Sequence, residues 1–119
     1  MLDDVNILIL EDEALIAMDV QLMLEERGAQ VTGPCATIEE ACAHGMDCDA
    51  AILDVDIHGS LTLPVADRLS DAGTPFLFHT GRSDLDLLRQ RYGADVPIVR
   101  KPAPGGELVR VLKDILNHG

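Results

Sequence analysis

Several polar side chains that handle phosphoryl groups stand directly after short apolar runs. Glu11 and Asp12 follow residues 5–10, Asp54 follows 50–53, Thr80 follows 76–79, and Lys101 comes two residues after 98–99. In a parallel sheet flanked by helices, the carboxyl ends of the strands lie along one edge, where ligands bind. The spacing therefore predicts one shallow site for phosphoryl transfer to a carboxylate, assisted by a divalent cation.

Three carboxylates at one site need a counter-charge. If Glu11, Asp12 and Asp54 meet within about 5 Å, each pair repels by roughly 3 kcal/mol at an effective dielectric constant of about 20. A bound proton or a hard cation relieves the repulsion, and ligation by oxygen alone suits Mg²⁺ or Mn²⁺. We expect an octahedral metal held by Asp12, Asp54, the backbone carbonyl of Asp56 and waters. Glu11 completes this metal site by holding a metal-bound water.

The same residues predict the roles in the transfer step. A phosphoryl group passes through a charged, in-line transition state, so catalysis consists mostly of positioning and neutralisation. Asp54 is the expected phosphoacceptor. The metal takes one phosphoryl oxygen, Lys101 a second and the Thr80 hydroxyl a third, with a backbone N–H near Gly81 as a further donor. The resulting aspartyl phosphate is labile, and water is its final acceptor.

Each motif alone has a plainer interpretation. An acidic pair favours the positive end of a helix dipole, and an aspartate after a strand is common in turns. Thr80-Gly81 reads as an ordinary turn, and Lys101-Pro102 as a surface loop. Their joint occurrence after successive strands favours the combined site.

Apolar runs alternate with helical patterns along the whole chain, which indicates a series of βαβ units. We expect strands at residues 5–10, 30–32, 50–53, 75–79 and 96–99. Helices are expected at residues 13–27, from 37 to near 44–45, and at 64–71, 84–91 and 106–116. The strands are apolar on both faces, as in a parallel sheet covered by helices on both sides. Residues 1–119 are therefore expected to form one α/β domain.

Local signals mark the ends of several helices. Thr37 and Glu40 have the spacing of a capping box, and Ser83 is a candidate N-cap. Pro64 suits the first turn of its helix. In the first helix, Leu15, Met18 and Leu22 share one side.

Composition and residue spacing disfavour nucleic-acid binding, a membrane location, a disulfide frame and a zinc site. The net charge is −12, from 21 acidic and 9 basic residues, which disfavours direct contact with nucleic acid. No apolar stretch is long enough to cross a membrane and no signal peptide opens the chain, so we expect a cytoplasmic protein. The 3 cysteines lack CxxC spacing, which argues against a disulfide frame or a zinc site. Among the histidines, His58 and His79 lie near the proposed site, and we expect exposed or hydrogen-bonded residues at loop ends.

The motifs together resemble the receiver domains of two-component response regulators. Ile-Leu-Glu11-Asp12-Glu13 resembles the acidic opening of that family, and Ala-Ile-Leu-Asp54-Val its phosphoacceptor strand. His-Thr80-Gly81 resembles its switch-hydroxyl strand and Lys101-Pro102 its lysine loop. The resemblance implies a flavodoxin-like (βα)5 three-layer sandwich with strand order 2-1-3-4-5, a topology for which a receiver is a known example.

The resemblance also implies partners. Asp54 would receive its phosphoryl group from a histidine kinase or a histidine phosphotransfer protein, and a downstream protein would bind the surface formed by residues 75–99. Receivers often pair through the face made by the helix at 84–91, the strand at 96–99 and the last helix. The Lys101-Pro102 peptide is commonly cis in this family. The chain would then be a signalling protein that catalyses only its own phosphorylation and dephosphorylation.

Three departures from the family pattern stand out. Ile98 occupies the position, three before the lysine, at which the family often has a switching aromatic residue. Residues 55–60 lack the common Met-Pro-Gly pattern. Residues 78–82 read Phe-His-Thr-Gly-Arg, which resembles, with two differences, the Phe-Ala-Thr-Gly-Tyr motif of an alphaproteobacterial subgroup that often stands alone and is linked to general stress signalling.

Two alternatives stay open. The chain could be a receiver taken from a longer hybrid kinase or DNA-binding regulator. It could also be a metal-dependent phosphatase or hydrolase with an aspartyl-phosphate intermediate, because such enzymes use a second acid two residues after the nucleophile and Asp56 stands there.

Overall fold

The structure is a computed structural model, which describes residues 2–44 and 47–118. One sheet holds five parallel strands in the order β2-β1-β3-β6-β7. Their bounds are β1 Asn6–Leu10, β2 Gln30–Cys35, β3 Ala50–Leu53, β6 Phe76–Thr80 and β7 Ile98–Arg100. Counted along the chain, these strands have the expected 2-1-3-4-5 order.

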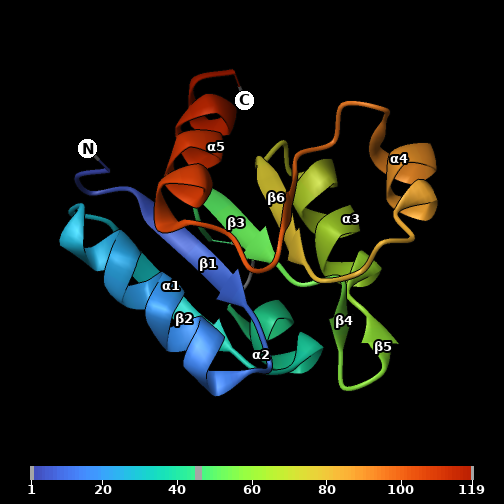
Figure 1. Cartoon of the computed structure of the whole chain (residues 1–119), viewed down its shortest axis with the longest axis horizontal. Coiled ribbons are helices and arrows are strands. Elements are labelled where there is room, and N and C mark those ends of the chain that lie inside the picture. Colours follow the sequence, from blue (N-terminus) through green and yellow to red (C-terminus); the bar gives the residue numbers. More distant parts are fainter. Residues whose placement is uncertain (1, 45–46, 119) are drawn as a thin grey trace.

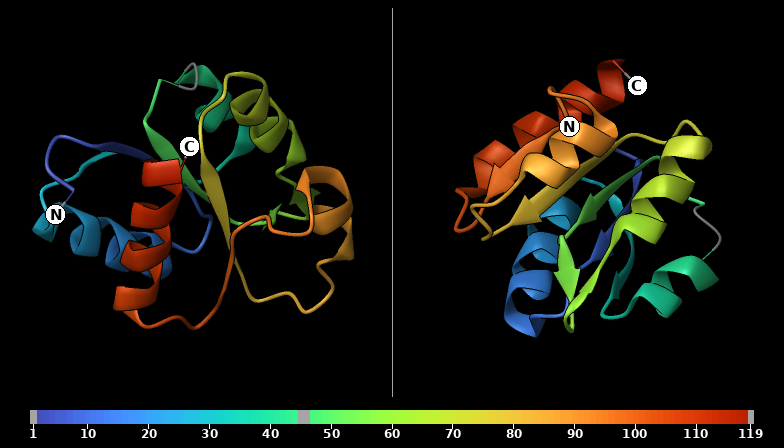
Figure 2. Two further views of the ribbon diagram at one scale, coloured as in Figure 1. Left: turned by 90° about the horizontal axis from the view of Figure 1, so that it is seen from above. Right: turned by 90° about the vertical axis from the view of Figure 1, so that its right-hand side faces the viewer.

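Helices cover both faces of the sheet (Figures 1 and 2). One face packs against α1 (Ala14–Glu26) and α5 (Gly105–His118), and the other against α2 (Ile38–Ala43), α3 (Leu63–Asp71) and α4 (Asp86–Tyr92). The flavodoxin-like three-layer sandwich is confirmed. No helix among residues 2–44 and 47–118 is both long and apolar enough to cross a membrane.

Strand periodicity explains the two cores. Successive side chains of a strand point to opposite faces; in β1, Leu8 and Leu10 pack with α2, α3 and α4, whereas Ile7 and Ile9 pack with α1 and α5. All four are fully buried. Each such side chain contributes roughly 1.5–3 kcal/mol of hydrophobic free energy, so the strands hold the loops that follow them in fixed positions.

The apolar side of α1 expected from the sequence faces solvent. Leu15, Met18 and Leu22 do share one side, but 78%, 52% and 52% of their surfaces are exposed. The residues of α1 that are buried lie on another side of the helix and are mostly smaller: Ala17, Val20 and Leu24. The helix carries two apolar sides, and only packing against the sheet and α5 decides which one becomes core.

The predicted helix signals have mixed outcomes. Thr37 caps α2 by accepting a hydrogen bond from the backbone N–H of Glu40, and its own hydroxyl donates to the Glu40 carboxylate. The Ser83 prediction is wrong, because α4 begins at Asp86 with Leu85 at its N-cap and no side-chain cap. Pro64 lies in the first turn of α3 as expected. The end of α2 agrees with the prediction up to His44, and Gly45 lies outside the described residues.

A small hairpin was not expected. β4 (Asp56–Ile57) and β5 (Ser60–Leu61) pair in antiparallel fashion shortly after β3. The two turn residues, His58 and Gly59, have φ values of 50° and 83°, as two-residue hairpin turns of type I′ require. Gly59 after a polar residue was the available signal, but strands of two residues are too short for periodicity to reveal.

β3 has the predicted bounds, whereas several ends of the other strands differ from the expectation by one to three residues. β7 begins at Ile98 rather than 96, because its ladder with β6 starts at the pair Phe78 and Ile98. β2 continues to Cys35, beyond the predicted end at 32, across an irregularity in its pairing with β1. Strand ends depend on the neighbouring strand, which a single run of residues does not specify.

Candidate functional site

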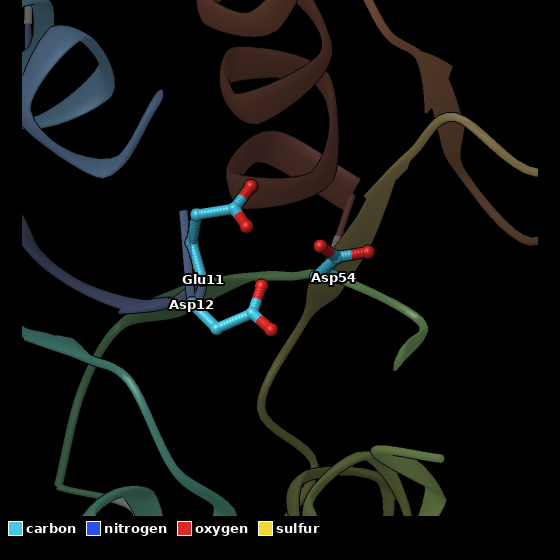
Figure 3. Close-up of side chains that lie close together, drawn as sticks. All are labelled: Glu11, Asp12 and Asp54. Atoms are coloured by element: carbon cyan, nitrogen blue, oxygen red, sulfur yellow. The ribbon is translucent and has the colours of Figure 1, made fainter. Parts of the chain in front are cut away.

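The structure brings the three predicted acids together at the carboxyl edge of the sheet. Glu11 and Asp12 follow the last residue of β1, and Asp54 follows the last residue of β3. Figure 3 shows the three carboxylates turned toward a common point, and one oxygen of each lies within 4.8 Å of the others. This convergence follows from topology, because β1 and β3 are neighbouring parallel strands whose ends are in register.

Lys101 joins the acids from the loop after β7. Its Nζ lies 2.5 Å from Oε1 of Glu11 and 3.0 Å from Oδ2 of Asp54. Its backbone N–H donates to the carbonyl of Thr80 at 2.8 Å, which ties this loop to the end of β6. The Lys101-Pro102 peptide is cis, as the family resemblance implied.

Burial and charge shift the pKa values of this cluster. Only 5% of the Glu11 surface is exposed, and burial raises its pKa to about 7 against the lowering effect of Lys101. Burial favours the neutral amine of Lys101, but hydrogen bonds to Glu11 and Asp54 outweigh this and raise the pKa of the ammonium. Glu11 and Asp54 share the single ammonium of Lys101. The cluster can therefore accept a second positive charge.

The residues present fit a divalent metal ion. The donor atoms are hard carboxylate oxygens, the set that Mg²⁺ and Mn²⁺ prefer. The Asp12 carboxylate accepts the backbone N–H of His58 at 3.1 Å and is half-buried, so Lys101 does not neutralise it. Asp12 and Asp54 are the residues of this cluster best placed to hold such an ion, because they line an open hollow, whereas Glu11 is buried beneath it and contacts Lys101 and the backbone N–H of Glu13.

Asp54 is held from several directions. Its N–H donates to the carbonyl of Leu10, and its Oδ1 accepts the N–H of Val55 at 2.7 Å. The fully buried Thr62 donates its hydroxyl to the carbonyl of Asp54 at 2.5 Å. Thr62 was not identified from the sequence, where a threonine before Leu63-Pro64 reads as a helix cap. It makes no side-chain cap hydrogen bond and instead fixes the backbone of Asp54.

An open hollow of about 350 Å³ lies over these groups. Its lining includes Asp12, Asp54, Asp56, Thr80 and Lys101, so the predicted residues other than the buried Glu11 border one space. The Thr80 hydroxyl accepts the backbone N–H of Arg82 at 3.0 Å and keeps its own proton available for an acceptor in the hollow.

Asp56 uses its carboxylate elsewhere. Nη1 of Arg82 lies 3.0 and 3.1 Å from its two oxygens. Arg82 lines the same hollow, yet the sequence offered no signal for this contact because the two residues are 26 positions apart. Metal ligation by the Asp56 backbone carbonyl remains a prediction.

The two histidines near the site differ from each other. The His58 side chain is exposed, as expected, and lies 3.7 Å from Asp12. His79 is not exposed, because it is buried near the end of β6. Burial and the nearby Lys101 lower the pKa of His79 to about 4, although Asp54 partly opposes them, so the imidazole is neutral at pH 7.

His79 is expected to make the protein sensitive to acid. Its pKa is lower in the folded state than its ordinary 6.5, so its contribution to stability is full above pH 6.5 and is lost as the pH falls through 4. Urea unfolding of the parent and of His79→Gln at pH 7.5 and 4.5 should show about 2 kcal/mol less acid-induced loss in the variant. His58→Gln is the control and should behave as the parent. Equal acid-induced losses in the parent and His79→Gln would contradict the assignment.

Comparisons with known proteins were made for the whole chain. No protein-family model and no curated protein sequence matches it. Among solved structures, SdrG from Pseudomonas melonis Fr1, in its BeF3-activated conformation, is 38% identical over 98% of this chain and 99% of its own, with a TM-score of 0.76. The signal receiver domain of a modulated diguanylate cyclase from Desulfovibrio desulfuricans G20 is 28% identical over 98% and 96% of the two chains, with a TM-score of 0.83.

A third structure is the response regulator PhyR from Brucella abortus. It is 26% identical over 97% of this chain, which spans 49% of that protein, and the TM-score is 0.79. The matched region in each case contains the whole sheet and the acidic edge described above. Topology, the convergence of acids, hydroxyl and lysine, and these similarities agree, and the chain belongs to the receiver domains of response regulators.

Proposed function

We propose that the chain accepts a phosphoryl group on Asp54 from the phosphohistidine of a histidine kinase or a histidine phosphotransfer protein. The observation that supports this best is the position of the Asp54 carboxylate at an open hollow, 3.0 Å from Lys101 and close to Asp12. Receiver relatives support phosphorelay signalling in general, and the donor class and the switching mechanism are parts of the proposal.

The chain's own residues account for the transfer. An oxygen of Asp54 attacks phosphorus in line, and the bond from phosphorus to the donor imidazole breaks, so the electron pair leaves with the imidazole nitrogen. Asp12 and Asp54, with the carbonyl of Asp56, would hold Mg²⁺ or Mn²⁺, whose charge neutralises the phosphoryl oxygens. Lys101 moves from the Asp54 carboxylate to a phosphoryl oxygen, and Thr80 donates its hydroxyl to another.

The first experiment measures the reaction directly. With Mg²⁺ and acetyl phosphate, the intact mass should rise by one phosphoryl group, about 80 Da. Borohydride reduction converts an acyl phosphate to the corresponding alcohol, so peptide mass spectrometry should locate the modification at Asp54. An unchanged mass with Mg²⁺ present, or a label at another residue, would contradict the proposal.

The solvent-facing side of α1 is a suitable docking surface for the donor. Leu15, Met18 and Leu22 form an apolar stripe on the helix that directly follows the acidic pair. Their spacing of three and four residues is that of a helix-to-helix contact. A groove of about 950 Å³ runs along the same helix and reaches Gly81 and Lys101, which also line the phosphoacceptor hollow. A helix seated there would bring its histidine to Asp54.

Substitutions in this stripe should separate docking from chemistry. Met18→Ser together with Leu22→Ser should lower the rate of phosphotransfer from a cognate kinase about 10-fold, because apolar contact area with the donor is lost. The free energy of unfolding should change by less than about 0.5 kcal/mol per site, as usual for exposed positions. Labelling by acetyl phosphate should be unchanged.

Leu87→Ser is the matched control, since Leu87 is 47% exposed on α4. It should leave kinase phosphotransfer unaffected. Equal losses in the α1 and α4 variants would argue against donor docking on α1.

For output we propose the surface formed by β6, α4 and β7, which a downstream protein would bind. α4 is short, buries only Leu88 within its own length, and is tied to α3 through Asp67, which accepts from Arg91 and Tyr92. An element with few buried contacts shifts at low cost. We also propose that two copies of the chain pair through α4, β7 and α5, which the molecular mass in solution would test. Membership of the stress-signalling subgroup is a further proposal, which partner binding would test.

A phosphatase remains a second candidate because Asp56 stands two residues after Asp54. Its carboxylate is bound to Arg82 rather than directed to an incoming substrate, which favours the receiver. Catalytic turnover of a phosphomonoester that is lost in both Asp54→Asn and Asp56→Asn would favour the enzyme instead.

A further inference from the structure

One ion pair at the phosphoacceptor hollow has no part in the chemistry described so far. Arg82 belongs to the segment that follows β6, and Asp56 is the first residue of the β4–β5 hairpin. Their side chains meet and both line the hollow that contains Asp54 and Thr80. The hairpin projects from the carboxyl edge of the sheet (Figure 1), so this pair links the hairpin to the loop that leads to α4.

The pair is weak in its present form. The side chains of Arg82 and Asp56 are 41% and 39% exposed, and exposed pairs contribute about 0–1 kcal/mol. Nη1 makes both contacts, so the two-pronged fork of the guanidinium is not used. Phosphoryl oxygens match that fork better than a single shared nitrogen matches a carboxylate.

Arg82 is also tied to the hydroxyl beside the reacting group. Its backbone N–H donates to Oγ1 of Thr80, a residue that is fully buried. Lys101, the other cation that lines the hollow among the described residues, is bound to Glu11 and Asp54. Conversion of the Asp54 carboxylate to an aspartyl phosphate adds negative charge to the hollow. Arg82 is the cation there whose present partner is easiest to leave.

We propose that Arg82 exchanges partners when Asp54 is phosphorylated, leaving Asp56 for the phosphoryl oxygens and releasing the β4–β5 hairpin. This inference rests on the proposed function. The hairpin ladder is short: Asp56 lies opposite Leu61 and Ile57 opposite Ser60, and the N–H of Thr62 donates to the carbonyl of Val55. Loss of the side-chain link therefore loosens it. The exchange gives the chain an occupancy-dependent contact although Ile98 stands where the family often has a switching aromatic residue.

A double-mutant cycle on anion affinity tests the exchange. Beryllofluoride with saturating Mg²⁺ serves as the phosphoryl stand-in, and fluorine NMR measures its dissociation constant. Arg82→Gln should weaken binding about 3- to 10-fold, since a charged hydrogen bond to the anion is lost. Asp56→Asn should strengthen binding about 3-fold, because Arg82 no longer has a competing partner.

The double variant decides between the two physical explanations. If Asp56 acts by holding Arg82, then Asp56→Asn has no effect in the Arg82→Gln background. If Asp56 merely repels the anion through space, Asp56→Asn strengthens binding by the same factor in both backgrounds, and the proposal is overturned. Arg89→Gln, an equal change of charge at an exposed residue of α4, should leave the affinity unchanged.

Hydrogen exchange gives a second readout. In the parent, beryllofluoride should speed exchange of the hairpin amides at Ile57 and Ser60, which face each other in the ladder; in Arg82→Gln, exchange should be fast already and insensitive to the anion. If the parent binds beryllofluoride and labels on Asp54 while hairpin exchange stays constant, the partner exchange fails and the proposed function stands. If the parent neither binds the anion nor labels, both fail.

Discussion

Replacing Asp54 with alanine is expected to abolish labelling by acetyl phosphate, a loss of at least about 100-fold against the parent. The carboxylate is the nucleophile of the proposed transfer, and its removal leaves no group that forms the bond to phosphorus. Asp54→Asn should fail equally while keeping nearly the same shape and the contact with the N–H of Val55. The measurement is intact mass after incubation with Mg²⁺ and acetyl phosphate.

Two controls show whether the loss is chemical. Asp84→Ala removes an exposed aspartate from the loop before α4 and should label as the parent does. Urea unfolding should show that Asp54→Asn remains folded, because neither core contains the residue. A labelled Asp54→Asn protein would show that another residue is the acceptor.

Replacing Asp12 with asparagine is expected to weaken Mg²⁺ binding about 100-fold, or about 2.7 kcal/mol. Asp12 is the acid of the cluster that Lys101 does not contact, so its charge is the part of the site that a divalent ion would chiefly satisfy. Labelling at limiting Mg²⁺ should fall in parallel and recover in part at high concentration. Calorimetric titration with Mg²⁺ measures the affinity.

Glu11→Gln is the matched comparison for this effect. Glu11 is buried, already contacts Lys101, and has a pKa raised to about 7. Its replacement should weaken Mg²⁺ binding less than Asp12→Asn does, by about 10-fold or less. Because its proton must leave before it can support a cation, the parent should bind Mg²⁺ more tightly as the pH rises through 7 and Glu11→Gln should respond less. Equal and negligible effects of the two substitutions would mean that the acidic pair only caps α1.

The strand and helix order was accessible from the sequence because its signals are local. Apolar runs such as residues 50–53 are buried in a parallel sheet wherever helices cover both faces, and Gly93 ends α4 with a φ of 102°. The residues that meet at the edge could be named for the same reason: a polar residue directly after a buried strand must lie at the strand's carboxyl end.

Contacts between residues far apart in the sequence could not be predicted from the sequence alone. Lys101 was expected at the site, but its contact with Glu11 spans 90 positions and its contact with Asp54 spans 47. Nothing in residues 78–82 indicates that Arg82 binds Asp56, or that Thr62 holds the backbone of Asp54. Such contacts depend on the angle at which loops leave the sheet, and neighbouring elements set that angle.

The α1 helix shows most clearly which features the sequence determines and which depend on tertiary packing. Its periodicity indicates a helix with apolar residues on one side, and this much the chain determines by itself. Burial of Ala17, Val20 and Leu24, with Leu15, Met18 and Leu22 left in solvent, was decided by the fit of the helix against the sheet and α5. The periodicity of a sequence shows which side chains share one side of a helix, but it does not show which side faces the core. The core-facing side is decided only when the helix packs against the sheet.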